Sequence, residues 1–209
     1  MRRIALMSLI VALIATEVGA QSSGPFRYVE GDEWQFSDAK GERSSTRVVK
    51  VDGDIIVMTG GIGTFSWSCP SCLFYMDSNL TVQRIEMAGG AQIDHLAFPN
   101  TTTIGWKYWD FPLALKKTWR FTASNVRNGP FRRTIDFTVE AYEDVTTKAG
   151  TFKAFRVRRD IEEEFGPTGR RGAKWTSVVW FAPEVKFVVK MKRTRDAGMD
   201  LELVSYSVK

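Results

Sequence analysis

Side chains that could carry out acid–base or nucleophilic chemistry are few in this sequence. Its single histidine, His95, stands between Asp94 and Leu96, a setting that matches no known arrangement of a nucleophile and its base. The run Glu162 to Glu164 offers neighbouring carboxylates, but three consecutive acids ahead of a Gly-Pro pair are typical of a solvated hairpin end. We therefore expect no catalytic residue, no metal site and no cofactor, and we expect that the protein is not an enzyme.

Cys69 and Cys72 are the only cysteines, and their spacing admits three chemistries. A thioredoxin-like redox pair needs its first cysteine at a helix N-terminus, whereas strand-like residues flank this pair. A zinc site needs four ligands, and His95 is far away in the sequence. In an oxidising compartment a small structural disulfide between Cys69 and Cys72 is the favoured interpretation, with redox activity and metal binding as the alternatives.

Residues 1–20 have the three parts of a cleavable secretory signal. Arg2 and Arg3 are followed by the apolar run Ile4 to Ala15, and Val18-Gly19-Ala20 is a small-residue cleavage site ahead of Gln21. The alternative is a retained N-terminal anchor. No later stretch reaches the roughly 18 apolar residues that a membrane-spanning helix needs. We expect a periplasmic or secreted protein with no transmembrane span after cleavage, in which residues 21–209 form a single β-rich domain.

The charge pattern argues against nucleic acid as a partner. The net charge is +5 at pH 7, which is a modest surplus for a chain of 209 residues. Basic residues are interleaved with acidic ones, as in the segment 156–164, whereas nucleic-acid-binding proteins usually gather them into one patch. The sequence identifies no protein partner.

Alternating polar and apolar residues predict an all-β fold. The segments Thr134–Ala141, Trp175–Phe181 and Val185–Met191 each have mostly apolar side chains at every second position, with Ser177 as an exception, which is the period of a half-buried strand. Turn-forming residues separate the strands, among them Asp52-Gly53-Asp54 and Lys148-Ala149-Gly150. No sustained helical period follows residue 20, so we predict mostly antiparallel strands with little helix.

A weak internal repeat suggests two similar β-meander halves that share one core. The segment Gly31–Phe36 (GDEWQF) resembles Lys116–Phe121 (KKTWRF), and strand-like segments follow each copy. The alternative is that any all-β chain rich in tryptophan matches itself to this extent.

A family resemblance rests on several segments of the chain. They are Gly31–Trp34, Phe111–Leu113 with Lys117–Trp119, Ala149–Val157, Trp180–Val185, Val188–Lys190 and Glu202–Tyr206. Together they resemble a family of bacterial exported proteins described only as domains of unknown function, which is distantly similar to the LolA/LolB-type lipoprotein carriers. The resemblance implies a curved antiparallel sheet, an incomplete β-barrel, whose concave face holds acyl chains under a helical lid. This sequence has no clear lid helices.

Aromatic side chains are the most distinctive chemistry of the sequence. Four of them stand within Trp106–Phe111, and most of the seven tryptophans should be core residues. A surplus could line an apolar ligand surface, for which the candidates are Trp34, Trp106, Trp109, Trp119 and Trp180. We predict a non-catalytic exported envelope protein that binds a hydrophobic or amphipathic, lipid-like ligand in a curved β-sheet. The alternative is an interaction or scaffold protein of the envelope without a ligand cavity.

Overall fold

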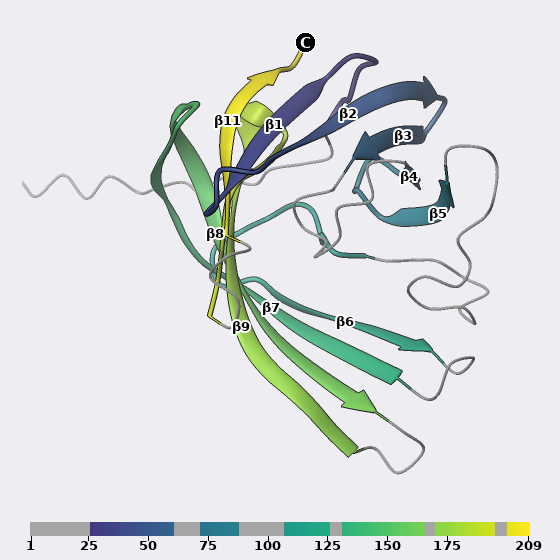
Figure 1. Cartoon of the computed structure of the whole chain (residues 1–209), viewed down its shortest axis with the longest axis vertical. Helices are drawn as coiled ribbons and strands as arrows, with labels where there is room; N and C mark the ends of the chain where they lie inside the picture. Colours follow the sequence, from purple (N-terminus) through teal and green to yellow (C-terminus); the bar gives the residue numbers. More distant parts are fainter. Residues whose placement is uncertain (1–25, 61–71, 88–106, 126–130, 166–169, 195–199) are drawn as a thin grey trace, which may run out of the picture.

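A computed structural model describes residues 26–60, 72–87, 107–125, 131–165, 170–194 and 200–209. Eleven antiparallel strands make up one sheet (Figure 1). The strands are β1 (Glu33–Asp38), β2 (Arg43–Asp52), β3 (Ile55–Gly60), β4 (Cys72–Met76), β5 (Val82–Met87), β6 (Thr118–Asn125), β7 (Phe131–Thr147), β8 (Gly150–Phe165), β9 (Arg170–Ala182), β10 (Phe187–Arg193) and β11 (Leu201–Ser207). The helical content of the described residues is one short 3₁₀ turn, η1 (Pro183–Val185).

The strand order across the sheet is β5-β4-β3-β2-β1-β11-β10-β9-β8-β7-β6. Strands β1 to β5 therefore form one meander and β6 to β11 a second, and the two meanders are joined where β1 pairs with β11. The sheet curves strongly but does not close, since β5 and β6 remain edge strands (Figure 1). The predicted all-β fold with a curved, open sheet is confirmed. Each meander begins at the tryptophan-containing strand of the proposed repeat, although the second has one more strand and longer ones.

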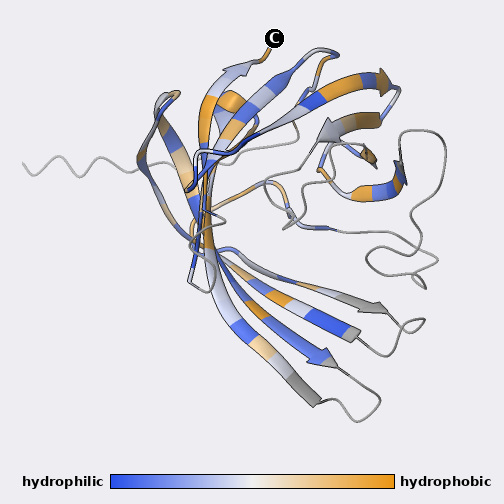
Figure 2. Ribbon diagram, viewed as in Figure 1, coloured by the Kyte–Doolittle hydropathy of each residue, from blue (hydrophilic) through white to orange (hydrophobic). Residues whose placement is uncertain are grey.

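Residues of alternating polarity build these strands, as Figure 2 shows along the sheet. Ile135, Phe137 and Val139 of β7 are buried as predicted, because their side chains share one face of the strand. Ala141, predicted on the same face, is only half-buried, because a bulge after Val139 shifts the register against β8. The predicted strand Val185–Met191 begins at Phe187 instead, since Val185 belongs to the 3₁₀ turn that Pro183 opens.

Two of the sequence segments that carried the family resemblance meet in one cluster of hydrogen bonds. The buried carboxylate of Asp32 accepts a hydrogen bond from the ammonium of Lys186 and one from the backbone N–H of Lys209. The indole N–H of Trp34 donates to the carbonyl of Val185 at 2.8 Å, and the hydroxyl of Tyr28 donates to the carbonyl of Lys186. These segments therefore fix the start of β1 against the 3₁₀ turn.

The hairpin of β7 and β8 extends past the body of the sheet and its tip lies beside β11 (Figure 1). The tip is held by hydrogen bonds from the backbone N–H of Ala149 to the carbonyl of Leu203 and from Lys148 to Ser37. The ring of Phe152 contacts that of Tyr206 edge-on. This arrangement accounts for the burial of Phe152 in a hairpin tip that would otherwise face solvent.

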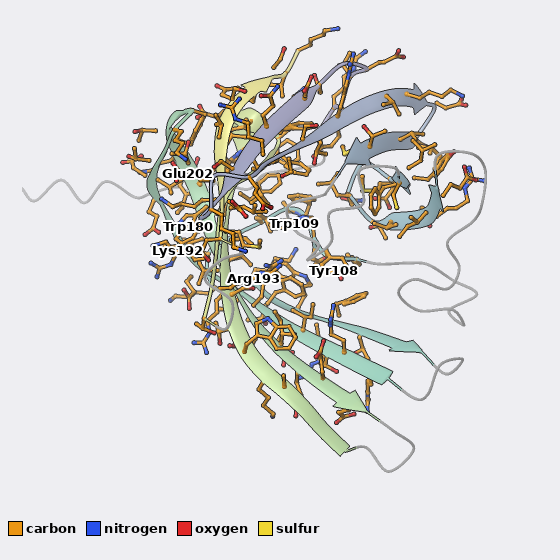
Figure 3. The ribbon with its side chains drawn as sticks, in the orientation of Figure 1. Tyr108, Trp109, Trp180, Lys192, Arg193 and Glu202 are labelled. Carbon is orange, nitrogen blue, oxygen red and sulfur yellow. The ribbon has the colours of Figure 1, made fainter. Side chains whose placement is uncertain are left out.

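The segment that precedes β6 packs against one side of strands β6 to β10. Tyr108 contacts Phe121 of β6, and Trp109 contacts Phe181 of β9. We call this side of strands β6 to β10 the inner face, and the side that carries Trp180 the outer face. Figure 3 shows Tyr108, Trp109 and Arg193 on the inner side of the central strands, with Trp180, Lys192 and Glu202 on the outer side.

Candidate functional site

The five tryptophans predicted as an apolar ligand surface do not gather in one place. Trp34 is fully buried in the core, where its ring stacks on Phe187 at 4.7 Å. Trp109 is buried as well, between the inner face and the segment that carries it. Trp106 lies outside the described residues. The aromatic segment before β6 is thus core in its described part, because it packs between side chains of the sheet.

Trp119 and Trp180 lie on opposite faces of the sheet. Trp119 is half-buried on the inner face of the edge strand β6, with its ring stacked on Phe137 at 4.7 Å and an interplanar angle of 7°. Trp180 is half-buried on the outer face, where its indole N–H donates to Glu143 at 2.9 Å. Of these two, only Trp119 could contact a ligand held on the inner face.

A row of directly opposite residues crosses the inner face from β6 to β10. Its members, in strand order, are Trp119, Phe137, Arg159, Ser177 and Arg193. Directly opposite residues of antiparallel strands project to the same face, so these five side chains lie next to one another. We call them the Trp119–Arg193 row. It is aromatic at the edge of the sheet and cationic toward the middle.

Two apolar rows flank the Trp119–Arg193 row. Toward the free ends of the strands lie Phe121, Ile135, Ile161 and Trp175. On the other side lie Val139, Val157, Val179 and Met191. The polar half of the central row is therefore enclosed by apolar side chains, in a surface that is otherwise typical of a hydrophobic core.

Arg159 is the most deeply buried charged group among the described residues of the inner face, with only 4% of its surface exposed. Its guanidinium donates to the hydroxyl of Ser177 at 2.8 Å and contacts the sulfur of Met191 at 3.1 Å. Burial, together with the positive charge of Arg193, lowers the pKa of Arg159 to about 10. Arg159 is therefore still a cation at neutral pH.

Tyr108 covers this cationic region from the inside. Burial raises the pKa of its hydroxyl, and the guanidinium groups of Arg133 and Arg159 oppose that rise. Arg133 also forms a short ion pair with Glu163 and lies 5.9 Å from the ring of Trp175. A tyrosine hydroxyl and three arginines thus share one side of the sheet.

The indole N–H of Trp119 is buried and has no hydrogen-bond partner among the residues that the structure describes. Buried donors in folded proteins almost always have a hydrogen-bond partner, and leaving a buried donor without one costs about 1–3 kcal/mol of stability. An unsatisfied donor in an aromatic wall is a position where an acceptor atom of a ligand would be stabilised.

Sequence reasoning missed Arg159, Ser177 and Arg193. The signal that could have identified Arg159 is its place between Val157 and Ile161, two positions away from each on a strand of period two. A charged residue at an apolar position of such a pattern is unusual. The same reasoning applies to Ser177 between Trp175 and Val179.

The outer face of β6 to β9 carries a charged groove of about 570 Å³. Its acids are engaged by bases on neighbouring strands, in pairs such as Arg120–Asp136 and Lys174–Glu162. Such an array of exposed ion pairs is expected of a solvated sheet face. The predicted solvated hairpin end is correct for Glu162 but wrong for Glu163, which turns to the inner face and is buried against Arg133.

The remaining chemical candidates lie mostly outside the described residues. His95, Cys69 and the predicted signal at 1–20 fall there. Cys72 is the first residue of β4 and is 2% exposed. Because Cys69 is outside the described residues, the disulfide between the two cysteines stays a prediction. In the described ranges no group of three or more histidine, cysteine or acidic side chains could hold a metal ion, and no helix is long and apolar enough to cross a membrane.

Three solved structures are similar to this chain at low sequence identity. A candidate lipoprotein from Parabacteroides distasonis is 14% identical with a TM-score of 0.48, and 90% of this chain and 100% of that chain are covered. The hypothetical lipoprotein YmcC from Escherichia coli is 11% identical with a TM-score of 0.44, covering 88% and 89%. A candidate exported protein with a YmcC-like fold from Bacteroides fragilis is 13% identical with a TM-score of 0.38, covering 87% and 98%.

The sequence comparison is more decisive than these structural likenesses. No curated protein matches the sequence. None of the three structures above is named as a LolA- or LolB-type carrier, so the distant similarity to those carriers stays a prediction. A family model described as DUF3108-like matches residues 35–207, which span all but a few residues of the eleven strands. The chain belongs to the DUF3108-like family.

Proposed function

We propose that this chain is an exported envelope protein that binds a hydrophobic or amphipathic, lipid-like ligand on the inner face of its curved sheet, without catalysing a reaction. The observation that carries the proposal is the unsatisfied, buried indole N–H of Trp119 within an aromatic wall. A ligand that covers the wall and accepts this hydrogen bond would remove the penalty of the unmade bond.

The composition of the inner face supports the same class of ligand. Sites for small molecules are mostly apolar, with a few polar groups that fix orientation. The two apolar rows and the aromatic end of the Trp119–Arg193 row supply the apolar surface. Trp119 and Trp175 are only half-buried, so part of this surface is accessible at the edge of the sheet and near the strand ends.

Export is supported by the sequence of the first 20 residues, which has the charged, apolar and small-residue parts of a secretory signal. In such a compartment a protein that shields an apolar or amphipathic molecule from water needs a surface of this type.

A dye titration tests the proposal. The protein is purified, delipidated and titrated with 1-N-phenylnaphthylamine, whose fluorescence rises in apolar surroundings. Trp119→Ala should weaken binding about tenfold, because the dye loses part of an apolar wall that contributes about 25 cal/mol per Å². Trp180→Ala is the matched control, since Trp180 is also half-buried but lies on the outer face.

The two variants separate the outcomes. Weaker dye binding in Trp119→Ala, with binding unchanged in Trp180→Ala and both variants folded by circular dichroism, supports the proposal. Absence of dye binding by the wild-type protein, or equal loss in both variants, contradicts it and favours a scaffold without a ligand surface. Organic extraction of the protein from its own cells, followed by mass spectrometry, would identify a bound lipid.

A further inference from the structure

We infer that β6 is a docking strand for a second copy of this chain. In the inferred dimer the β6 strands of the two copies pair antiparallel about a two-fold axis through Phe121, so that one sheet runs through both copies. The pairing uses the free edge of the sheet and does not depend on the ligand proposed for its inner face.

The free edge of β6 is open and regular. β6 is the last strand in the sheet order, and among the described residues only β7 pairs with it (Figure 1). Its eight residues match those of β7 one to one, with no shift in register. The side chains of Thr118, Arg120 and Thr122 are exposed. A regular strand of this length presents a continuous row of unpaired backbone groups to another strand.

Features that normally protect an edge strand are missing from β6. Proteins block such edges with lysine, proline, a bulge or an inward-pointing charge. The β6 sequence TWRFTASN has no lysine and no proline. Its one charged residue, Arg120, is turned toward β7, where it donates to the carboxylate of Asp136 at 2.6 and 2.9 Å. The other edge strand, β5, carries Arg84 and Glu86 and has a bulge in its pairing with β4. β6 is therefore the less protected edge of the described sheet.

The hydrogen-bond pattern indicates which backbone groups of β6 are free. Just before β6 begins, the backbone N–H of Val139 donates to the carbonyl of Lys117 at 2.9 Å. Successive residues of a strand direct their N–H and C=O groups to opposite sides, so the backbone groups of Thr118, Arg120 and Thr122 point away from β7. A partner strand would bond to these groups without disturbing the pairing of β6 with β7.

Residue types restrict where the two-fold axis can lie. Directly opposite side chains project to the same face, so the apolar faces of two β6 strands coincide only when the axis passes through a residue. An axis through Arg120 would set two guanidinium groups directly opposite each other, which is destabilising. An axis through Trp119 would set Lys117 opposite Phe121. An axis through Thr122 would leave each aromatic residue of β6 opposite a small or polar one.

An axis through Phe121 gives complementary pairs along the strand. The two Phe121 residues are opposite each other, and aromatic pairs contribute more than the burial of their area alone. Arg120 is opposite Thr122 of the second copy, and these two residues bond through the backbone groups that β7 leaves free. Trp119 is opposite position 123, where the sequence has alanine, so a large residue meets a small one. Because each copy uses its β6 edge for the other, association stops at the dimer.

Sedimentation velocity of the purified full chain tests the inference. Between about 1 and 200 µM the wild type should change from monomer to dimer without larger species, since a small interface gives a weak dimer. Thr122→Pro removes a free-edge N–H but no hydrogen bond to β7, so it should weaken dimerisation about tenfold or more. Thr122→Ala keeps the N–H and is the matched control, which should dimerise as the wild type does. Circular dichroism checks that both variants are folded.

Charge substitutions at the same position test the register. In the inferred dimer, position 122 of one copy is directly opposite Arg120 of the other. Thr122→Glu should therefore tighten the dimer and Thr122→Lys should weaken it, each by about three- to tenfold, because every cross-strand pair occurs twice at a two-fold interface. High salt should reduce both effects, since the side chains at these positions are exposed.

Three results would overturn the inference. A wild type that stays monomeric at about 200 µM excludes a second copy as the occupant of this edge and favours an extended segment of another protein. Equal dimerisation of Thr122→Pro and Thr122→Ala would place the interface elsewhere on the molecule. Weaker dimers for both Thr122→Glu and Thr122→Lys would contradict the axis through Phe121. Ligand binding is measured separately by the dye titration, so each proposal can fail without the other.

Discussion

The carboxylate of Asp32 and the ammonium of Lys186 lie 3.1 Å apart, although 154 residues separate them in the sequence. Asp32 is fully buried, and it also accepts hydrogen bonds from the backbone N–H groups of Val29 and Lys209. One side chain thus connects the segment before β1, the turn before β10 and the segment after β11. The contacts of Asp32 and Trp34 therefore give the GDEW segment of the family resemblance a role in the fold.

Replacing Asp32 by Ala should destabilise the protein by about 3–5 kcal/mol, because the change leaves the largely buried ammonium of Lys186 without its carboxylate partner and two part-buried backbone N–H groups without their acceptor. Urea unfolding followed by tryptophan fluorescence measures the loss. Asp52→Ala is the control, since Asp52 pairs with Lys50 on the surface, and it should have no measurable effect. Equal stability of the Asp32 variant and the wild type would contradict the structural role of this carboxylate.

Trp34→Ala should cost about 3–5 kcal/mol of unfolding free energy, since a fully buried ring stacked on Phe187 leaves a large cavity when it is removed. Trp180→Ala should cost about 1 kcal/mol, because that ring is half-buried and loses mainly its hydrogen bond to Glu143. Chemical denaturation of the two variants side by side gives the comparison. A larger loss for Trp180→Ala would show that their burial is assigned the wrong way round.

Gly60→Ala should be strongly destabilising, and more so than Gly53→Ala. Both glycines have positive φ, which costs another residue about 1–2 kcal/mol. A Cβ at Gly60 would come within 1.8 Å of the carbonyl oxygen of Ser45 on the neighbouring strand, so the backbone would have to move. A Cβ at Gly53 meets nothing within 4 Å. Thermal unfolding midpoints should rank wild type, Gly53→Ala and Gly60→Ala in falling order.

Asp110 should contribute to loss of stability in acid. Its hydrogen bond from Lys107 is the main cause that lowers the pKa of its carboxyl below the ordinary 3.8, with a further contribution from Lys117. A lowered folded-state pKa means that the stabilisation is present above the unfolded-state value and is lost as the pH falls through the folded-state value. Stability of Asp110→Asn should therefore fall less steeply than that of the wild type below about pH 4. Parallel slopes in urea unfolding at several pH values would contradict this.

Thiol counting tests the predicted disulfide between Cys69 and Cys72. Protein prepared from the periplasm and denatured without reductant should show no free thiol. Two free thiols would end the idea of a structural disulfide. Because the closed loop is very short, reduction should change stability little.

Strand periodicity and turn residues were sufficient to predict the fold class. The alternation in β7 and the turn at Asp52-Gly53-Asp54 reflect local backbone geometry, which the sequence encodes directly. Bulges were not predictable in the same way. The bulges after Val139 and after Val188 depend on how two strands with different curvature match their hydrogen bonds, and this is decided by the whole sheet.

The candidate site was harder to predict because its residues are brought together by the register between paired strands. Trp119, Arg159 and Arg193 are far apart along the chain and become neighbours only through the pairing of β6 to β10. Tryptophan content pointed to an apolar surface, yet it could not separate the inner-face Trp119 from the outer-face Trp180. That distinction depends on a one-residue difference in strand position, which reverses the face of a side chain.

The pairing of β1 with β11 places the beginning and the end of the described sheet side by side at its centre. A chain that emerges from a ribosome or a translocation channel with its N-terminal part first can assemble β1 to β5 early, but β1 then keeps an unpaired edge until β11 arrives. Contacts between such distant segments form slowly. Until they form, the unpaired backbone groups of β1 are open to pairing with strands of other chains. The period between the appearance of β1 and that of β11 is therefore when this protein is most prone to aggregate and has most need of a chaperone.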